Sequence, residues 1–353
     1  MEINRTDFGQ LSNGTKIEKI DLINHHHIKV SILTYGGIIQ CIKTPDEEGN
    51  FKDIVLGYDS IEGYENDPYY MGAVVGPVAG RLTNAQFPLN GKLIKLEANA
   101  GQHQLHGGSK GLHQKVWEIT EIEQRHHSLK VKLSTKAENE ENGYPGNREF
   151  SVSYILNNKN QLMIYFDAIS DADTIINMTS HSYFNLSDKE NETVHEHLAM
   201  INSQKILSVD EELIPNGEFD FVLGKAHNFS RGKVIGEALA QLPDGLDHIY
   251  VINKEAGAFG ISAKVVHKKS GRNLDVVTDQ PAVVFYTNNY PDGSILGKND
   301  LAIIKHGAFC LEPQHYPDSP NHAHFPSITL KAGEKYKSRT QITFGLESDS
   351  HHH

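Results

Sequence analysis

Short runs of alternating apolar and polar residues dominate this sequence. The clearest is Leu129-Lys130-Val131-Lys132-Leu133, in which every second side chain is apolar. Because successive side chains of a strand point to opposite faces of a sheet, this period of two predicts a strand with one buried face. The same criterion predicts strands at residues 28–35, 150–156, 162–169, 261–267, 282–287 and 327–330.

Turn-forming pairs separate these runs, whereas helical periodicity is scarce. Asn-Gly, Ser-Gly and Asp-Gly pairs adopt the positive φ that tight turns need. They occur at residues 13–14, 90–91, 270–271 and 292–293. Short helices are expected only near residues 60–64 and 209–213. The pattern therefore predicts an all-β protein whose strands form a large antiparallel β-sandwich with few short helices.

The chain shows no internal repeat, low-complexity block or linker, so residues 1–345 are expected to form a single domain. A chain of 353 residues can bury a large core. The last residues, 346–353, end in three histidines and are interpreted as a tail derived from a purification tag.

Composition excludes several classes of partner. The formal net charge is −12, whereas binding to nucleic acid needs clustered Lys and Arg. No run approaches the ~18 consecutive apolar residues of a membrane helix, and the first residues lack the pattern of a signal peptide. Cys41 and Cys310 form neither a disulfide framework nor a CxxC pair. We therefore expect a cytoplasmic protein that binds neither nucleic acid nor membrane.

One stretch combines an apolar strand, a carboxylate and a loop rich in proline. It covers residues 309–322 and places Glu312 at the end of the strand. Pro313 has no backbone N–H, so it is expected to end central strand pairing there. A carboxylate on such a stiff element suits a positioned general base. Taken alone, Glu312 is more simply a carboxylate exposed to water at a strand end.

Four other segments carry polar groups that suit a ligand. Glycines lie beside Arg81 and His106, so a ligand can approach the backbone closely at both places. His181 lies among short polar and aromatic residues and titrates near neutrality. Asp247 precedes an apolar strand. Each also has an ordinary structural explanation: a surface arginine, two structural histidines and a turn aspartate.

Two motifs are rejected as catalytic or metal sites. Residues 107–111 match the G-x-S-x-G pattern of serine hydrolases, but the buried strand before it and the helix after it that this motif needs are not predicted. His195 and His197 have the spacing that places two rings on one strand face, as do His322 and His324. No third ligand accompanies either pair at a telling spacing. We interpret His195 and His197 as solvated surface residues.

Taken together, these segments resemble the aldose 1-epimerase (galactose mutarotase) family. The matching motifs follow the family's order over nearly the whole chain: Gly80-Arg81 with Asn84, Leu89-Asn90-Gly91, Leu105-His106-Gly107-Gly108, Val116-Trp117, Thr179 to Leu186, Val209 to Pro215, Leu246-Asp247-His248, Phe285-Tyr286-Thr287 and Leu311-Glu312-Pro313-Gln314. The resemblance implies a large antiparallel β-sandwich with an open sugar-binding cleft, which agrees with the strand pattern.

The reaction that the resemblance implies interconverts the α and β anomers of a free aldohexose such as galactose or glucose. Glu312 would remove the proton from the C1 hydroxyl, and His181 would protonate the ring oxygen, so that the ring opens. His106 would hydrogen-bond near that oxygen, and Arg81 and Asp247 would hold substrate hydroxyls. Each positioned proton transfer can contribute roughly 10²–10⁴-fold to the rate. At ordinary pKa values, an ionised carboxylate and a protonated histidine coexist near neutral pH.

The resemblance further implies Asn84 and Tyr183 as substrate-binding residues. It implies no metal and no organic cofactor, and a monomer or homodimer whose partner is a small-molecule aldohexose. Two departures from the family's pattern affect substrate contacts. Ala85 stands where many members have a basic residue, and Val284 stands where some have Gln.

Three alternatives use the same residues. A hexose-6-phosphate 1-epimerase would need several converging Arg or Lys residues, whereas these segments offer chiefly Arg81. A glycosidase would use Glu312 and Asp247 as paired carboxylates. A non-catalytic sugar-binding or sensing module could share the sandwich, because a fold alone does not fix function. Loss of Glu312 or His181 would favour that module, yet both are present.

Overall fold

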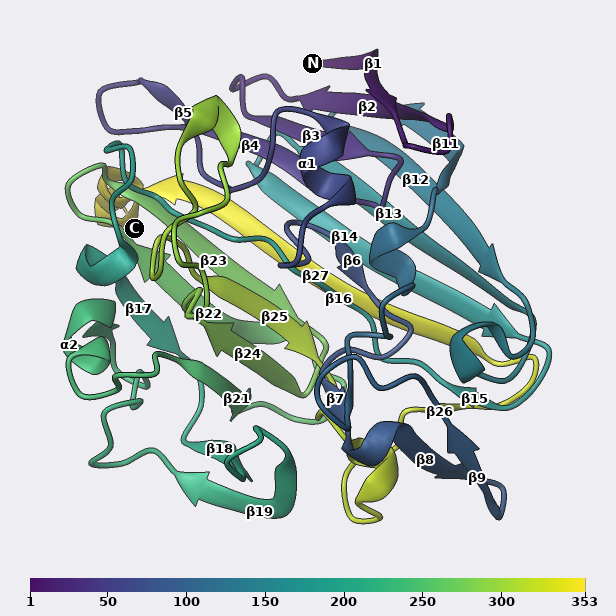
Figure 1. Cartoon of the computed structure of the whole chain (residues 1–353). Coiled ribbons are helices and arrows are strands. Elements are labelled where there is room, and N and C mark those ends of the chain that lie inside the picture. Colours follow the sequence, from purple (N-terminus) through teal and green to yellow (C-terminus); the bar gives the residue numbers. More distant parts are fainter. Residues whose placement is uncertain (353) are drawn as a thin grey trace.

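The computed structural model describes residues 1–352, with side chains described through residue 349, and consists mainly of antiparallel strands (Figure 1). Two short α-helices occur in this range, α1 (Ile61–Glu65) and α2 (Ile235–Leu239). Among the described residues, no helix has the length and apolar character needed to cross a membrane. The predicted all-β class is confirmed.

Three large sheets carry most of the strands. The first has the order β1-β2-β3-β4-β5, with β1 (Glu2–Gln10), β2 (Lys16–Ile23), β3 (Lys29–Leu33), β4 (Ile39–Pro45) and β5 (Phe51–Asp53). The second has the order β11-β12-β13-β14-β27-β23-β22-β17-β20, with β11 (Glu118–Gln124), β12 (Ser128–Ala137), β13 (Arg148–Asn157), β14 (Gln161–Ser170), β27 (Lys335–Leu346), β23 (Arg272–Thr278), β22 (Gly260–Val266), β17 (Leu198–Ile201) and β20 (Lys233–Val234). The third has the order β19-β18-β21-β24-β25, with β19 (Pro215–Phe221), β18 (Lys205–Val209), β21 (Asp247–Val251), β24 (Ala282–Tyr286) and β25 (Cys310–Gln314).

Short two-stranded ribbons and 3₁₀ segments are the other regular elements of the described chain. The ribbons pair β6 (Val74–Val75) with β16 (Thr179–Ser180), β7 (Arg81–Leu82) with β10 (Gln104–Leu105), β8 (Gln86–Leu89) with β9 (Lys92–Lys95), and β15 (Thr174–Ile175) with β26 (Thr329–Leu330). The 3₁₀ turns are η1 (Thr83–Ala85), η2 (Leu112–Gln114), η3 (Glu141–Gly143), η4 (Val194–Glu196), η5 (Lys298–Asp300), η6 (Ser319–Asn321) and η7 (Glu347–His352).

The nine-stranded sheet forms one layer of a sandwich, and the two five-stranded sheets form the other. One buried apolar cluster joins residues of β2, β3 and β4 to residues of β12, β13 and β14. The same cluster joins β24 and β25 to β22, β23 and β27. Each five-stranded sheet therefore packs against its own half of the long sheet, as aligned sheets do in a sandwich. The predicted β-sandwich is confirmed.

The predicted strands are all present with shifted ends, whereas only one of the two predicted helices is present. Helix α1 lies one residue from the expected position, and α2 was not expected. Residues 209–213 are not helical: they hold the end of β18 and a turn. The Asp210 carboxylate accepts hydrogen bonds from the N–H groups of Glu212 and Ile214, and Leu213 has φ of 64°. The aspartate thus stabilises a turn in competition with a helix.

Two local interpretations were wrong. Pro313 does not end the strand but lies within β25, opposite Val283. Because β25 is the last strand of its sheet, the missing N–H of proline removes no central hydrogen bond. His197 is not a solvated surface residue but has 0% exposure, because η4 turns its ring into the core.

The end of the chain continues the nine-stranded sheet. Strand β27 runs through Leu346, one residue past the predicted domain boundary, and η7 follows it. The Ser348 hydroxyl donates to the Glu47 carboxylate at 2.8 Å. The last residue of the predicted tail, 353, lies outside the described residues.

One buried guanidinium connects the two layers. Arg272 of β23 is 1% exposed and donates to the carbonyls of Thr44, Leu186 and Asn50. It also donates to the Asp188 carboxylate at 2.6 Å. Segments far apart in the sequence are thereby held at one point.

We predict that Arg272→Met lowers the free energy of unfolding by about 3–5 kcal/mol, because it leaves a carboxylate and several carbonyls without their partner. Urea denaturation followed by circular dichroism measures the change. Arg125→Met is the control, since this side chain is 73% exposed and its loss should change stability by less than about 0.5 kcal/mol. Equal stabilities of the two variants would contradict the prediction.

Candidate active site

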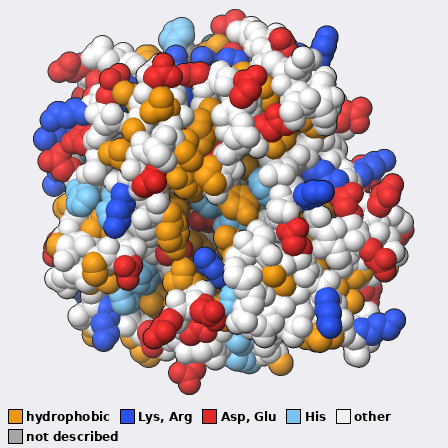
Figure 2. Space-filling view, in the orientation of Figure 1, with side chains coloured by type: hydrophobic (Ala, Val, Ile, Leu, Met, Phe, Trp, Pro, Cys, Tyr) orange, Lys and Arg blue, Asp and Glu red, His pale blue; other side chains and the backbone are white. Residues whose placement is uncertain are grey.

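One face of the third sheet forms the floor of a cavity. Pairing between β21, β24 and β25 aligns Asp247 with Tyr286 and Cys310, and aligns Ile249 with Val284 and Glu312. Alternate strand residues share a face, so these rows lie side by side on the side of the sheet opposite the sandwich core, where Ile249, Val284, Tyr286 and Cys310 belong to a second buried cluster. The cavity has a volume of about 140 Å³. Figure 2 shows this face of the molecule hollowed near its centre, with hydrophobic side chains around the opening.

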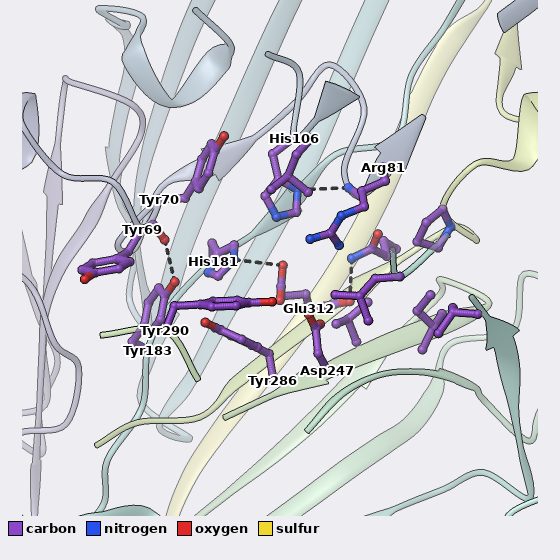
Figure 3. A pocket seen from close by; sticks show the side chains of 18 of the residues that line it. Tyr69, Tyr70, Arg81, His106, His181, Tyr183, Asp247, Tyr286, Tyr290 and Glu312 are labelled. Carbon is purple, nitrogen blue, oxygen red and sulfur yellow. Dashed lines mark hydrogen bonds and ion pairs between the residues drawn. The ribbon is translucent and has the colours of Figure 1, made fainter. Parts of the chain in front are cut away.

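The opposite wall comes from short segments distant in the sequence. Arg81 lies on β7 and pairs with Leu105, which directly precedes His106. His181 follows β16, where the Thr179 hydroxyl donates to the Pro313 carbonyl at 2.8 Å. That bond fixes the segment of His181 to the strand of Glu312. Figure 3 shows the side chains from both walls converging on one space.

Glu312 and His181 form a buried pair at the centre of the cavity. The Glu312 Oε1 and His181 Nε2 atoms are 3.4 Å apart, and their side chains are 4% and 5% exposed. Glu312 Oε1 has no hydrogen-bond partner among the described residues. It is therefore free to accept a hydrogen bond from a ligand hydroxyl.

Burial moves both pKa values toward the neutral forms. It lowers the pKa of His181 to about 4, and it raises the pKa of Glu312 well above its usual range. The negative charge of Asp247 raises the pKa of Glu312 further. This corrects the expectation drawn from ordinary pKa values, because in the cavity without a ligand desolvation disfavours a carboxylate beside an imidazolium.

His106 presents one defined ring nitrogen to the cavity. Its Nδ1 accepts a hydrogen bond from the backbone N–H of Gly80 at 3.0 Å. The neutral ring therefore carries its proton on Nε2, which can donate to a ligand. Burial, followed by the charges of His181 and Arg81, lowers the pKa of His106 well below its usual value. His106 is thus a neutral hydrogen-bond donor.

The second ring nitrogen of His181 meets a thiol. Cys310 Sγ lies 3.7 Å from His181 Nδ1, and Cys310 is 0% exposed. Burial raises the pKa of the Cys310 thiol well above its usual value, as do the charges of Glu312 and Asp247. The thiol therefore keeps its proton, and one side of the His181 ring is occupied by a neutral partner.

Asp247 and Arg81 supply opposite charges near the pair. Burial raises the pKa of Asp247 to about 6, and the charge of Arg81 partly opposes that rise. In Figure 3, Asp247 lies beside Glu312 while Arg81 approaches from the other wall. These two residues can bind hydroxyl groups as acceptor and donor.

The structure brings together most of the predicted site residues. Arg81, His106, His181, Asp247 and Glu312 all line the cavity. Three of these five residues lie in or directly after strands of only two residues, β7, β10 and β16. Contacts between segments distant in the sequence are therefore needed to bring the five side chains together.

The remaining two predicted substrate-binding residues differ in position, since Tyr183 lines the cavity and Asn84 does not. Tyr183 lines the cavity, but its hydroxyl donates to the Tyr69 carbonyl at 2.6 Å and its ring stacks on His181. Asn84 is exposed and is absent from the residues that line the cavity. It lies in η1 with φ of 54°, and its backbone N–H donates to His103. The left-handed turn explains the small polar residue at position 84 without a ligand.

Sequence reasoning missed several cavity residues. Tyr70, Tyr286, Tyr290 and Gln314 line the space without having been assigned a role. Gln314 carried a usable signal, because it lies two residues after Glu312 and so shares its face. Tyr286 stood in the matching motif Phe285-Tyr286-Thr287 without a role. Tyr70 and Tyr290 carried no signal, since an aromatic residue in a strand or turn is ordinarily part of the core. Val284 lies between Ile249 and Glu312, so the wall beside Glu312 is apolar at this position.

The same three central residues have the spacing of a metal site. Ligand atoms of His106, His181 and Glu312 lie within 4.8 Å of one another. The pairing of His106 Nδ1 with a backbone N–H leaves only Nε2 for such a role. Two arrangements therefore fit the residues: acid–base chemistry on a polar ligand, or coordination of an ion.

The fold and this site define a β-sandwich protein with a buried acid–base pair in a cavity lined by hydrogen-bonding groups. Residues 18–343 match the family model described as aldose 1-epimerase. The chain belongs to the aldose 1-epimerase family and is therefore an isomerase.

Curated relatives match over nearly their full length. A galactose mutarotase of Bos taurus is 37% identical over 98% of this chain and 99% of its own. An aldose 1-epimerase of Haemophilus influenzae is 33% identical over 94% of this chain and 97% of its own. The solved galactose 1-epimerase of Lactobacillus acidophilus has a TM-score of 0.85 at 28% identity, and covers 98% of this chain and 99% of its own.

We predict that Asp247→Asn lowers the pKa of the Glu312 carboxyl group, because it removes the negative charge that adds to the effect of burial. The pKa should remain above the ordinary value, since burial is the larger cause. Carbon-13 NMR of labelled glutamate, assigned with Glu312→Gln, measures it. Asp292→Asn serves as the control, since this carboxylate is exposed and outside the cavity. An unchanged or raised Glu312 pKa in Asp247→Asn would contradict the prediction.

Proposed function

We propose that this protein interconverts the α and β anomers of free aldohexoses such as galactose and glucose, by opening and closing the sugar ring. The observation that carries the proposal is the buried pair of Glu312 and His181, with Oε1 and Nε2 separated by 3.4 Å and Oε1 without a hydrogen-bond partner among the described residues. Ring opening of a hemiacetal requires one proton to leave as another arrives. Glu312 can accept the leaving proton while His181 supplies the arriving one, so the pair meets that requirement.

Each step uses a group in a defined position. Glu312 takes the proton of the C1 hydroxyl while His181 gives a proton to the ring oxygen, so the bond from C1 to that oxygen breaks and an aldehyde forms. Rotation about the C1–C2 bond presents the other carbonyl face, and both transfers reverse. His106 Nε2 donates a hydrogen bond near the ring oxygen, and Arg81 and Asp247 hold hydroxyls.

The neutral pair without a ligand is compatible with this sequence. A neutral Glu312 with a neutral His181 holds the same single proton as a carboxylate with an imidazolium. A sugar hydroxyl that donates to Glu312 Oε1 favours the ionised carboxylate. Substrate binding thereby moves the proton from Glu312 to His181, the arrangement that ring opening needs.

Charge favours a free sugar over a hexose 6-phosphate. Arg81 is the single Lys or Arg among the described residues that line the cavity. A phosphate dianion is ordinarily bound by several charge-assisted hydrogen bonds from such residues. The group 3.4 Å from the Glu312 carboxyl group is the imidazole of His181. This pairing favours proton transfer between a carboxyl group and a histidine over a glycosidase mechanism, which uses two carboxyl groups. A binding module without catalysis would not need this pair.

The setting proposed with this activity is the cytoplasm. Both cysteines are free and buried, which suits a reducing compartment. We propose a monomer or homodimer that needs no cofactor and binds neither nucleic acid nor a membrane.

We predict that Glu312→Gln nearly abolishes the enzymatic mutarotation of freshly dissolved α-D-galactose and α-D-glucose, measured by polarimetry. His181→Asn should lower kcat at least ~10²-fold, as expected for a lost general acid. His106→Asn should lower it less, because His106 only donates a hydrogen bond. Turnover by Glu312→Gln at the wild-type rate would contradict its role, and the same assay with hexose 6-phosphates tests the alternative substrate.

We also predict that kcat/KM stays high as the pH falls from neutrality and declines only near pH 4. Catalysis requires exactly one proton shared by Glu312 and His181. Below about pH 4, His181 gains a proton while Glu312 keeps its own, so no base remains. Above the raised Glu312 pKa the shared proton is lost, so no acid remains. Rates corrected for buffer catalysis give the profile, and an acidic limb near pH 6.5 would show an unperturbed histidine instead.

A further inference from the structure

A second cluster of ligand-type side chains lies outside the cavity of the candidate active site. Ligand atoms of Glu192, Glu196 and His267 all lie within 4.8 Å of one another. None of these residues lines the cavity that contains Glu312. We infer that they form a binding site for a divalent transition-metal ion, with Zn²⁺ as the ion that the donor set fits best.

His267 points to a ligand because one of its ring nitrogens is buried and unpaired. The residue is 2% exposed, and its Nε2 has no hydrogen-bond partner among the described residues. Its Nδ1 lies 2.8 Å from the Ser270 hydroxyl oxygen and accepts a hydrogen bond from the Ser270 backbone N–H at 3.2 Å, so Nε2 is the nitrogen that remains available. Without a metal, the neutral ring therefore carries its proton on Nε2. Metal binding at Nε2 moves the proton to Nδ1, which then donates to the Ser270 hydroxyl instead of accepting from the Ser270 N–H. Such an outer hydrogen bond ordinarily fixes the ring of a metal-binding histidine.

The surroundings restrict the histidine ring to this direction. Ser270 also donates to the Leu186 carbonyl at 2.9 Å, which fixes the hydroxyl that meets Nδ1. The fully buried ring of His197 packs against His267, with centroids 4.8 Å apart. His197 is itself oriented by the Leu186 N–H, which donates to its Nε2 at 2.9 Å. His267 is therefore preorganised rather than free to rotate.

The two glutamates lie on the neighbouring segment between Leu186 and β17. The Glu192 carboxylate accepts a hydrogen bond from Ser187, and its backbone carbonyl accepts one from Asn185 at 2.8 Å. Glu196 lies in η4 and is exposed, so its side chain can adjust.

A modest adjustment closes the site. Zinc lies about 2.0–2.2 Å from nitrogen and carboxylate ligands, so two ligand atoms of a tetrahedral site are roughly 3.3–3.6 Å apart. The observed limit of 4.8 Å is wider than this, and rotation of the exposed Glu196 side chain can bring its carboxylate closer to the other two ligands. One histidine and two glutamates leave the fourth tetrahedral position to water.

An existing ion pair competes with the metal only weakly. Lys269 Nζ lies 3.1 Å from Glu196, with side-chain exposures of 64% and 52%. Exposed ion pairs contribute little stability, so a divalent cation can displace this lysine.

Metal binding would stabilise the fold rather than take part in the reaction. It would join the segment of Glu192 and Glu196 to the turn at residues 267–271, between β22 and β23. An ion that binds only the folded state raises its stability with increasing concentration. The inference is independent of the proposed function, because none of its three ligands contacts the candidate active site cavity.

Calorimetric titration with ZnCl₂ tests the site. The titration uses His181→Asn as the parent protein, because this substitution disrupts the other possible metal site at His106, His181 and Glu312. The parent should bind one Zn²⁺ more than the double variant that also carries His267→Gln. Glu192→Gln should weaken this binding at least ~10-fold. Loss of a residue that only supports a ligand already costs about 10–100-fold in metal affinity, and Glu192 is a ligand itself. His195→Gln is the matched control, because His195 lies beside Glu196 in η4 but is not one of the three proposed ligands.

Two further measurements keep the inference falsifiable if His267→Gln folds poorly. Zinc should raise the Tm of the parent and of His195→Gln, but not that of Glu192→Gln, whose side chain is only half-buried. In zinc-soaked crystals, an anomalous difference peak should lie among Glu192, Glu196 and His267. Equal zinc stoichiometry in the parent and a folded His267→Gln, or no peak at this position, would overturn the inference. The parent and the His267→Gln variant share all other histidines, so zinc binding by those residues cancels in their comparison.

Discussion

The register between β21, β24 and β25 is the constraint on which the candidate active site depends. It places Asp247, Val284, Tyr286 and Glu312 on the face of the sheet that points away from the core between the two layers. A slip of one residue in any of these strands would turn its side chains to the opposite face. The alternate residues of the same strands, such as Phe285, pack into the sandwich core. Burial of those residues thus determines the register, and the register positions the chemistry.

Desolvation is the second determinant, because it acts on every ionisable group at the centre of the cavity. It favours the neutral forms of Glu312 and His181, and it keeps the Cys310 thiol protonated. A pair that is neutral without a ligand avoids the cost of burying two separate charges. It still holds the single proton that ring opening needs, so stability of the cavity and proton transfer do not conflict.

The segment from His181 to His197 connects the candidate active site to the proposed metal site. At its start, Thr179 fixes it to the strand of Glu312, and at its end His197 packs beside His267. In between, Leu186 is held at both its N–H and its carbonyl. A metal ion at the second site would add a further anchor to this segment. The active site would then rest on a loop whose position is defined at both ends.

The sequence by itself determined the strands, the sandwich class and six cavity residues, because period-two patterns and short polar motifs are local properties. It did not determine that Asn84 lies outside the cavity in a left-handed turn, or that the Tyr183 hydroxyl donates to the Tyr69 carbonyl. It also did not determine the turn that Asp210 stabilises at residues 209–213, or the burial of His197 between the layers. The protonation of Glu312 and His181 was also decided only by the tertiary structure. A pKa follows from the water and charges that surround a group, and segments distant in the sequence supply both here, as Asp247 does for Glu312.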